Sequence, residues 1–445
     1  MLLNTPKFFL FLFVSISIGI FFGVLFTVYS KYNIQNIDNN FASDGSQLSY
    51  DTSLINDTSL VNNPSFGNAT SEDIVTRTSN FEETLIDLDT PPLINMNTLT
   101  DTIKSIYLTG WSAGTKSKRQ TVIENMKTYG FNAVVIDIKD EAGQISYPSN
   151  VKTAIDISAS KKMISNIQDV IQEFHDNDIY VIGRIVTFKD PTYAKRVPEI
   201  AYHKADGALW QDYSGNNWPN PYNQNSWNYP IELAKEAANL GFDEIQFDYI
   251  RFPSSEGKTK NIAFGFESEI KSKADIINSF LMKVMEELKD FDVVVSADVF
   301  GITTKKAGDF EHIGQDFQAI AKIVDVICPM IYPSHYGFGE YGIKNPDTKP
   351  YNIVNAATND ALKLYSAVSG DVKLAKIRPY LQDFTATWLK KGNYILYDTQ
   401  AVTDQLKACY DLEIYDFTLW DPSNKYAYEA LVKVNENESG DLIDF

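Results

Sequence analysis

The feature that most constrains the fold of this chain is a regular alternation after residue 100. Short runs rich in β-branched residues alternate with amphipathic stretches of helical periodicity. The predicted strands are residues 105–109, 133–138, 180–186, 244–249, 293–299, 326–332, 374–380 and 414–420. The predicted helices include residues 117–129, 161–177, 231–240, 274–289 and 353–369. Such alternation is typical of parallel strands joined by right-handed crossovers.

Eight strand–helix units over residues 101–437 predict an α/β fold, the closed (β/α)8 or TIM barrel, whose members span from about 200 to more than 400 residues. The alternative is an open, doubly wound sheet, which usually carries a glycine-rich phosphate-binding turn after its first strand. The segment in that place, Gly110 to Gly114, reads GWSAG and matches such a turn only weakly. The sequence therefore favours the barrel.

An uncharged apolar segment precedes the barrel. No charge lies between Lys7 and Lys31, and a helix of this length, at about 1.5 Å per residue, can cross a bilayer core of about 30 Å. Residues 24–29 offer no small-x-small cleavage site. We therefore expect a transmembrane helix over residues 8–30, within an anchor of residues 1–31. Lys7 favours a single-pass cell-membrane protein with the barrel outside the cytoplasm, and secretion after signal cleavage is the alternative.

The segment between anchor and barrel, residues 32–100, is acidic and of low complexity. Its ten acids against Arg77 alone contribute −9 of the net charge of −19. Low apolar content and self-repelling charge are typical of a disordered linker. A short acidic tail, residues 438–445, follows the barrel. The strongly acidic balance of the chain also argues against nucleic acid as a partner, because the two would repel each other.

Residues suited to metal or thiol chemistry are few. The two cysteines, Cys328 and Cys409, are too few for a thiolate cluster or a disulfide framework. The four histidines form no HxH, HExxH or ExxH pattern. We therefore expect neither a metal nor a cofactor.

Polar residues interrupt the apolar strands near their carboxyl ends, where barrel enzymes carry their chemistry. Strand alternation separates Ile245 and Phe247 from Gln246 and Asp248, and it predicts that the second pair faces the barrel lumen. Asp298 occupies the corresponding place on the next strand. Because adjacent strands lie about 4.8 Å apart, Asp248 and Asp298 are expected to face each other across a few ångströms.

Two facing carboxyl groups are the minimal apparatus for cleaving a glycosidic bond. One exchanges a proton, while the other stabilises or traps the oxocarbenium-like carbon. Their proximity also raises one pKa, which keeps that acid protonated near neutral pH. The other strand ends supply groups that suit a polyhydroxylated ligand. With Gln246, the predicted substrate-binding residues are Asp137, Lys139, Glu141, Arg184, Arg251, Tyr332, Arg378, Gln382 and Trp420.

Alternatives remain for these residues. A single buried aspartate can belong to a structural ion pair, Arg184 and Arg378 can simply neutralise buried acids, and Trp420 can pack the top of the barrel. For the whole chain, the alternative is a non-catalytic carbohydrate-binding barrel that serves the envelope as an adhesin or scaffold. A phosphodiesterase is less favoured, because that chemistry typically needs two histidines or a metal cluster and only His335 lies at a suitable strand end.

Five motifs, in this order, resemble a bacterial family of glycoside hydrolase domains of the TIM-barrel type. They are YLTGWSAG (107–114), AVVIDIKD (133–140), FDYIRFP (247–253), SADVFG (296–301) and CPMIYPSHY (328–336). That family is distantly similar to the α-galactosidase and α-amylase types, and the likeness covers residues 100–435. In those relatives an aspartate on the fourth strand is the nucleophile, so the resemblance implies this role for Asp248.

The role of general acid/base for Asp298 is inferred instead from its position: strand alternation places it on the lumen-facing side, near the carboxyl end of its strand. Together these observations predict a membrane-anchored glycoside hydrolase that acts on a cell-surface or environmental polysaccharide.

Overall fold

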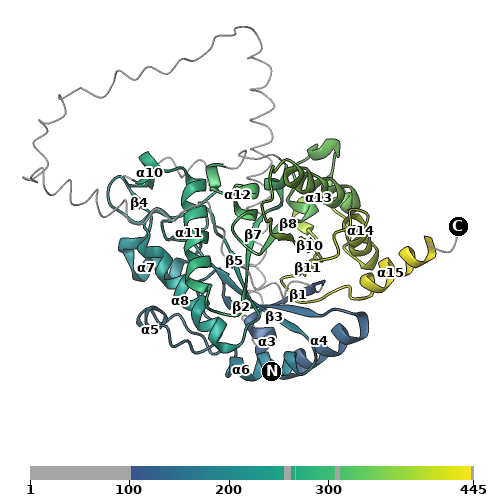
Figure 1. The fold of residues 1–445 in the computed structure, drawn as a ribbon, viewed down its shortest axis with the longest axis horizontal. Helices are drawn as coiled ribbons and strands as arrows, with labels where there is room; N and C mark the ends of the chain where they lie inside the picture. The colour runs from purple at the N-terminus through teal and green to yellow at the C-terminus, as the bar shows by residue number, and fades with distance from the viewer. Residues whose placement is uncertain (1–101, 255–261, 266, 306–310, 442–445) are drawn as a thin grey trace, which may run out of the picture. The chain divides into compact units, whose positions relative to one another are not determined.

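The computed structural model describes residues 102–254, 262–265, 267–305 and 311–441 (Figure 1). At its centre is a closed barrel of parallel strands surrounded by helices. The strands, in order around the barrel, are β1 (Lys104–Leu108), β2 (Ala133–Lys139), β3 (Tyr180–Val186), β5 (Glu244–Asp248), β7 (Val294–Phe300), β8 (Val326–Ile331), β9 (Lys376–Ile377) with β10 (Tyr380–Gln382), and β11 (Phe417–Trp420). The barrel closes because β11 pairs with β1 and β10 pairs with both β8 and β11.

The predicted barrel is thus confirmed, with strands at all eight predicted places. The seventh predicted strand, residues 374–380, differs in detail because it is split into β9 and β10. Pro379 lies at the break, where it has no N–H to donate to a neighbouring strand. Arg378 lies between the two short strands, where its N–H still donates to the Ile327 carbonyl of β8 at 3.0 Å.

Helices form the outer layer of the barrel (Figure 1). The longer ones are α4 (Lys116–Tyr129), α6 (Ile167–His175), α8 (Asn225–Leu240), α11 (Lys273–Leu288), α13 (Pro350–Ser366), α14 (Thr399–Tyr410) and α15 (Glu429–Asp441). The shorter ones are α3 (Gly110–Gly114), α5 (Lys152–Asp156), α7 (Pro191–Arg196), α10 (Glu267–Ile270) and α12 (Phe317–Ala321).

Two of the predicted helices begin six residues away from the predicted position. The helix predicted over residues 161–177 starts only at Ile167, because the side chain of Asn166 caps it by accepting from the Gln168 N–H. By contrast, α8 starts six residues before the predicted position and contains Pro230. This proline lies in the second turn, where it costs one backbone hydrogen bond without ending the helix.

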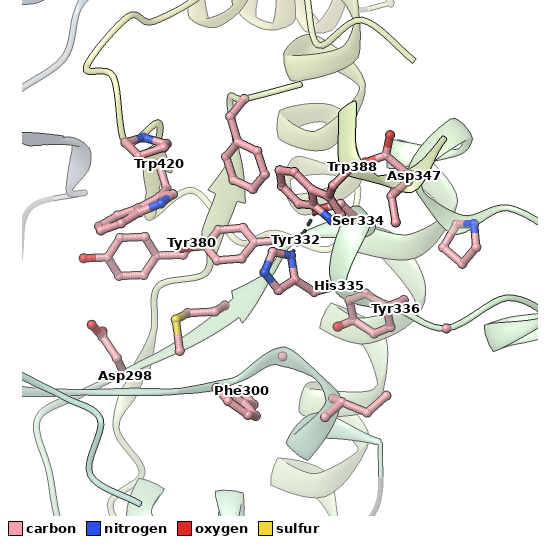
Figure 2. A pocket seen from close by; sticks show the side chains of 18 of the residues that line it. Asp298, Phe300, Tyr332, Ser334, His335, Tyr336, Asp347, Tyr380, Trp388 and Trp420 are labelled. Atoms are coloured by element: carbon pink, nitrogen blue, oxygen red, sulfur yellow. Dashed lines mark hydrogen bonds between the residues drawn. The ribbon is translucent and has the colours of Figure 1, made fainter. Parts of the chain in front are cut away.

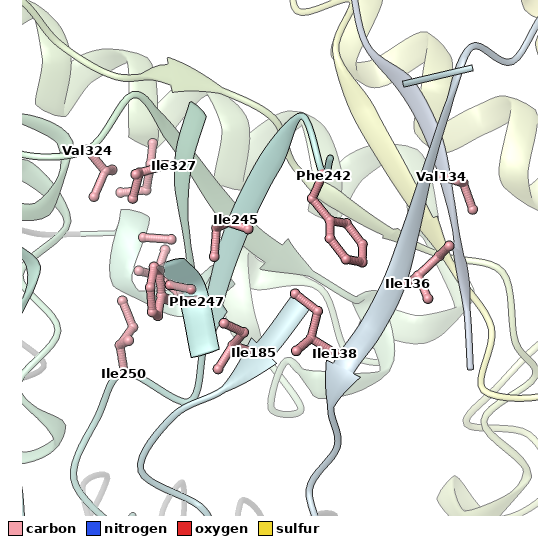
Figure 3. Close-up of a cluster of buried hydrophobic side chains, with 14 of the residues drawn as sticks. Val134, Ile136, Ile138, Ile185, Phe242, Ile245, Phe247, Ile250, Val324 and Ile327 are labelled. Atoms are coloured by element: carbon pink, nitrogen blue, oxygen red, sulfur yellow. The ribbon is translucent and has the colours of Figure 1, made fainter. Parts of the chain in front are cut away.

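The hydrophobic core lies between the strands and the outer helices. Ile136, Ile185, Ile245 and Phe247 are fully buried there and extend outward from β2, β3 and β5 (Figure 3). Because side chains alternate along a strand, the neighbours of these residues face the barrel interior. This arrangement fixes which polar side chains reach the lumen.

The long segment after β3 is folded onto the carboxyl end of the barrel wall. It contains α7, the 3-10 turn Pro198–Ile200 and β4 (His203–Lys204), which pairs with β6 (Ile262–Ala263) in a small antiparallel sheet. Trp218, which follows β4, is buried. It packs against the Tyr249 ring beyond the end of β5, with ring centroids 6.1 Å apart.

Within the ranges described above, no helix is both long and apolar enough to cross a bilayer. The predicted transmembrane helix over residues 8–30 and the predicted linker of residues 32–100 lie outside those ranges. The anchor, the linker and the cell-membrane localisation therefore stay predictions.

Candidate active site

The strand register makes Asp248 and Asp298 neighbours. β5 pairs with β7 from Glu244↔Val294 to Phe247↔Ala297, and the next residue on each strand is an aspartate. Asp248 is 4% exposed and Asp298 is 1% exposed. Both side chains line one cavity of about 510 Å³ at the carboxyl end of the barrel, a volume typical of a small-molecule site.

The cavity brings together seven of the residues predicted for the site, and aromatic side chains form much of its wall. The seven are Glu141, Arg184, Asp248, Arg251, Asp298, Tyr332 and Trp420. Figure 2 shows Asp298 near Tyr380 and Tyr332, with Trp420 beyond them and His335 and Trp388 further along the wall. A bound sugar ring would therefore meet carboxyl groups at one end of the cavity and ring faces along its length.

Arg184 is the electrostatic centre of the charged end. Its Nε and Nη2 donate to Oδ2 of Asp248 at 3.0 and 2.6 Å. Nη1 donates to Asp137 at 2.7 Å and Nη2 to Glu141 at 2.6 Å. Burial would lower the pKa of Arg184, but the three carboxylates raise it well above its ordinary value. One buried cation thus holds three acids in fixed positions.

Asp248 is held by donors on both oxygens. Besides the two N–H groups of Arg184 on Oδ2, the backbone N–H of Tyr249 donates to Oδ1 at 2.5 Å. Tyr249 has a φ of +52°, a strained conformation for a bulky residue that is found mainly where the surroundings enforce it. The backbone of β3 supports this turn, because the N–H of Thr187 donates to the Asp248 carbonyl at 2.8 Å.

Asp298 has a different environment. Its Oδ1 is buried and has no hydrogen-bond partner among the described residues. Burial raises the pKa of Asp298 well above its ordinary value, and repulsion from Asp248 raises it further, while Arg184 and Arg378 oppose the shift. The protonated form of Asp298 is therefore favoured beside a fully hydrogen-bonded Asp248.

The other two acids around Arg184 also differ from each other. Burial raises the pKa of Asp137 to about 7, although Arg184 lowers it and the Tyr107 hydroxyl donates to Oδ2 at 2.5 Å. For Glu141, burial is outweighed by Arg184 and Lys189, which bring its pKa down to about 2. Glu141 is thus the charged member that faces the cavity, whereas Asp137 lies behind Arg184.

Five of the predicted substrate-binding residues lie outside the lining of this cavity: Asp137, Lys139, Gln246, Arg378 and Gln382. Lys139 is fully buried and donates to Asp190 at 2.6 Å, while its ammonium lies 4.9 Å from the centre of the Tyr229 ring. The pairing of β2 with β3 shifts register between Asp137 and Lys139. Lys139, which was predicted to bind substrate because it lies at the end of the second strand, pairs with Asp190 and lies outside the cavity lining.

The remaining three residues form buried contacts outside the cavity lining. Arg378 forms a buried ion pair with Glu244, at the start of β5. Gln246 accepts a hydrogen bond from the Tyr380 hydroxyl at 2.5 Å. Gln382 accepts from the Ser334 N–H at 3.0 Å and donates to Asp347 at 2.9 Å, so it joins two loops of the cavity wall.

An aromatic wall made by His335, Tyr380, Phe384 and Trp388 was absent from the predicted substrate-binding set. The rings of Phe384 and Trp388 stack with centroids 5.8 Å apart, and His335 meets both edge-on. Burial lowers the pKa of His335 to about 4, so this imidazole is neutral at neutral pH. The sequence feature that could have indicated this wall is the pair of aromatic residues after the seventh predicted strand, Phe384 and Trp388.

Among the residues that the structure describes, no group of three or more His, Cys, Asp or Glu side chains is arranged to hold a metal ion. The lining of the cavity supplies carboxyl groups, guanidinium groups and aromatic rings.

Comparison with known proteins gives a family and a fold. The family model described as "Putative glycosyl hydrolase domain" matches residues 105–426. The glycoside hydrolase domain of PgaB (BpsB) from Bordetella bronchiseptica is 13% identical, with a TM-score of 0.53 over 75% of this chain and 99% of that chain. The α-L-fucosidase isoenzyme 2 from Paenibacillus thiaminolyticus is 10% identical, with a TM-score of 0.51 over 76% of this chain and 49% of that chain.

A hypothetical protein from Ruminiclostridium thermocellum is 44% identical over 44% of this chain and 97% of that chain, with a TM-score of 0.41. No curated protein matches the chain. The two glycosidase structures share the barrel at low identity, whereas the family model spans most of the chain, including the segments around Asp248 and Asp298. The chain therefore belongs to this family of glycosyl hydrolase domains, as its motifs implied.

Proposed function

We propose that this chain hydrolyses a glycosidic bond with Asp248 and Asp298 as its catalytic pair. The single observation that carries the proposal is the contrast between two neighbouring carboxyl groups in one cavity. Asp248 accepts hydrogen bonds on both oxygens, whereas the buried Asp298 lacks a partner for Oδ1 within the described residues and favours its protonated form. A carboxyl group that favours its protonated form beside a second, hydrogen-bonded carboxyl group can serve as the proton donor of such a pair.

The proton movements follow from this contrast. Asp298 donates its proton to the glycosidic oxygen as the bond to the anomeric carbon breaks, so the leaving sugar departs as an alcohol. Asp248 stabilises or captures the positive anomeric carbon. The Asp298 carboxylate then takes a proton from the attacking water, which restores both groups.

The surrounding residues have supporting roles in this proposal. Arg184 orients Asp248 and leaves it little freedom to rotate. Tyr332 and Trp420 line the cavity, where their rings can pack against the C–H groups of a sugar. These proton movements correspond to retention of configuration, expected at a carboxyl separation of about 5–5.5 Å. A separation of about 6.5–9.5 Å would give inversion, with Asp248 taking the proton of the attacking water instead of Asp298.

We propose a cell-surface or environmental polysaccharide as the substrate. The support is the predicted anchor over residues 8–30, which would hold the barrel outside the cytoplasm. The amphipathic, ring-lined cavity suits part of a glycan chain better than it suits a wholly apolar ligand.

The test is a screen of the full chain, in detergent, against a panel of purified envelope polysaccharides. New reducing ends are measured for the wild type and for Asp248→Asn side by side. Reducing ends from the wild type alone would support the proposal. Binding of a glycan with no new reducing ends after long incubation would overturn it and would favour the non-catalytic binding barrel.

A further inference from the structure

Arg251 is a buried cation that lines the cavity without a carboxylate partner. It is 2% exposed, and Nη1 donates to the backbone carbonyl of its neighbour Phe252 at 3.0 Å. Among the described residues no carboxylate lies within ion-pair distance of its guanidinium. The two other buried arginines of the barrel interior are both paired, Arg184 with three acids and Arg378 with Glu244.

Three aromatic rings hold the Arg251 guanidinium in place. Its central carbon lies 4.6 Å from the ring centre of Phe300, 4.9 Å from that of Tyr249 and 5.2 Å from that of Trp218. Contacts of this kind fix the orientation of a guanidinium and compensate part of its lost hydration. Among the described residues, only one of its five N–H donors has an acceptor, the Phe252 carbonyl.

A charge in this position is costly. Taking a guanidinium out of water costs several kcal/mol unless an opposite charge or a full set of acceptors replaces the water. Burial lowers the pKa of Arg251, although Tyr249 and Asp248 partly oppose this effect. A buried, perturbed ionisable group that lines a cavity is a candidate for a ligand-binding group.

A second cation increases the positive potential on this side. The ammonium of Lys189 lies 4.7 Å from the centre of the Tyr249 ring and 3.3 Å from its hydroxyl. Within the described ranges Lys189, too, forms no ion pair. Lys189 and Arg251 therefore flank Tyr249, next to the strained turn that carries Asp248.

We propose that Arg251 binds a carboxylate of the substrate, so that the glycan is acidic and carries uronic-acid-type sugars. This inference rests on the proposed function and extends it to a substrate class. The planar fork of a guanidinium matches the two oxygens of a carboxylate, and the resulting pair would neutralise the buried charge. A neutral hydroxyl would accept one hydrogen bond and leave the charge uncompensated.

The net charge of the chain works against an acidic substrate at long range, and this repulsion has to be offset locally. At −19 the chain repels polyanions, so an acidic glycan needs a local cation that is not already committed. Arg184 is committed to three acids, which leaves Arg251, supported by Lys189.

The test uses matched polymers and the full chain in detergent. Polygalacturonate, alginate and hyaluronan are each compared with their carboxyl-reduced, neutral forms. Affinity is measured by calorimetry, and reducing ends are measured in parallel. At least one acidic polymer should bind roughly tenfold to a hundredfold more tightly than its neutral form, the range for a charge-assisted hydrogen-bonded pair. Equal binding of both forms, or no binding of any acidic polymer, would overturn the proposal.

Variants then test whether Arg251 causes the preference for the acidic polymer over its carboxyl-reduced form. Arg251→Met should abolish the preference for the acidic polymer, and Arg251→Lys should keep part of it. The matched control is Arg196→Met, at the exposed end of α7, which should keep the full preference. Circular dichroism checks that each variant is folded. A full preference in folded Arg251→Met would contradict the assignment, and the wild-type comparison decides the substrate class even if that variant does not fold.

The two proposals fail in different ways. Hydrolysis of neutral polymers without any preference for acidic ones would overturn the Arg251 proposal and support the hydrolase. Acid-selective binding that depends on Arg251, without new reducing ends, would support the Arg251 proposal and overturn the hydrolase.

Discussion

Arg184 donates from both Nε and Nη2 to a single oxygen of Asp248, Oδ2, at 3.0 and 2.6 Å. Asp298, the neighbour of Asp248 across the β5–β7 register, accepts no hydrogen bond on its buried Oδ1 from the part of the chain that the structure describes. Two chemically identical side chains on adjacent strands thus have opposite electrostatic surroundings. The predictions below follow from this difference and from the buried pairs that surround it.

Replacing Asp248 by asparagine should reduce hydrolysis by about 10³-fold or more, because the amide can neither carry the negative charge nor capture the anomeric carbon. The measurement is the initial rate of reducing-end formation on the best polysaccharide. Asp169→Asn, on the exposed first turn of α6, is the matched control and should retain full activity. Unchanged hydrolysis by folded Asp248→Asn would remove Asp248 from the mechanism.

Activity should depend on Asp298 remaining protonated. As the pH rises through the raised pKa of Asp298, the proton donor is lost and kcat/KM of the wild type should fall. Asp298→Asn should lose this alkaline limb and have a low rate, most of all on substrates with poor leaving groups. A pH profile of kcat/KM for both proteins tests this, and an unchanged alkaline limb in the variant would assign it to another group.

The same group should affect stability. A carboxyl whose folded pKa is raised binds more protons in the folded than in the unfolded chain, so the wild type loses stability as pH rises from the unfolded value of about 3.9 to the folded pKa. Asp298→Asn lacks this loss and should be the more stable protein at neutral pH. Denaturant unfolding of both proteins at acidic and neutral pH measures the difference. A variant that is less stable at every pH would contradict the expectation.

Arg184→Met should be strongly destabilising, by about 3–5 kcal/mol, because three carboxyl groups would lose their shared cation in a buried site. Denaturant unfolding at neutral pH gives the free energy, with exposed Arg196→Met as the matched control. A loss within 0.5 kcal/mol, the usual effect of a surface substitution, would mean that the acids are solvated in solution.

Lys139→Met should lower stability without changing KM. The Lys139–Asp190 pair is fully buried and lies away from the cavity lining, so breaking it leaves an unpaired charge at a cost of about 3–5 kcal/mol. Adding Asp190→Asn should recover part of the loss, since the amide oxygen can still cap α7 by accepting from the Tyr193 N–H. A raised KM in folded Lys139→Met would show that Lys139 contacts substrate after all.

The fold was largely predictable because its signals are local. Alternation within each strand separates Ile245 and Phe247 from Gln246 and Asp248 whatever the rest of the chain does. This rule could not show that Lys139, at the end of β2, pairs with Asp190, which lies 51 residues away in sequence. It also could not show that Arg378, at the break beside Pro379, pairs with Glu244, which lies 134 residues away in sequence.

By itself, the sequence determined that parallel strands alternate with helices, that two aspartates end neighbouring strands with the same parity, and that the chain carries a large negative charge. Only the tertiary structure decided which polar groups share a cavity and which are neutralised. It pairs Arg184 with three acids and places Asp298 where burial favours the protonated carboxyl group. It also surrounds the Arg251 guanidinium with the rings of Trp218, Tyr249 and Phe300. Charge environment depends on burial and on contacts between distant segments, and those exist only once the barrel has closed.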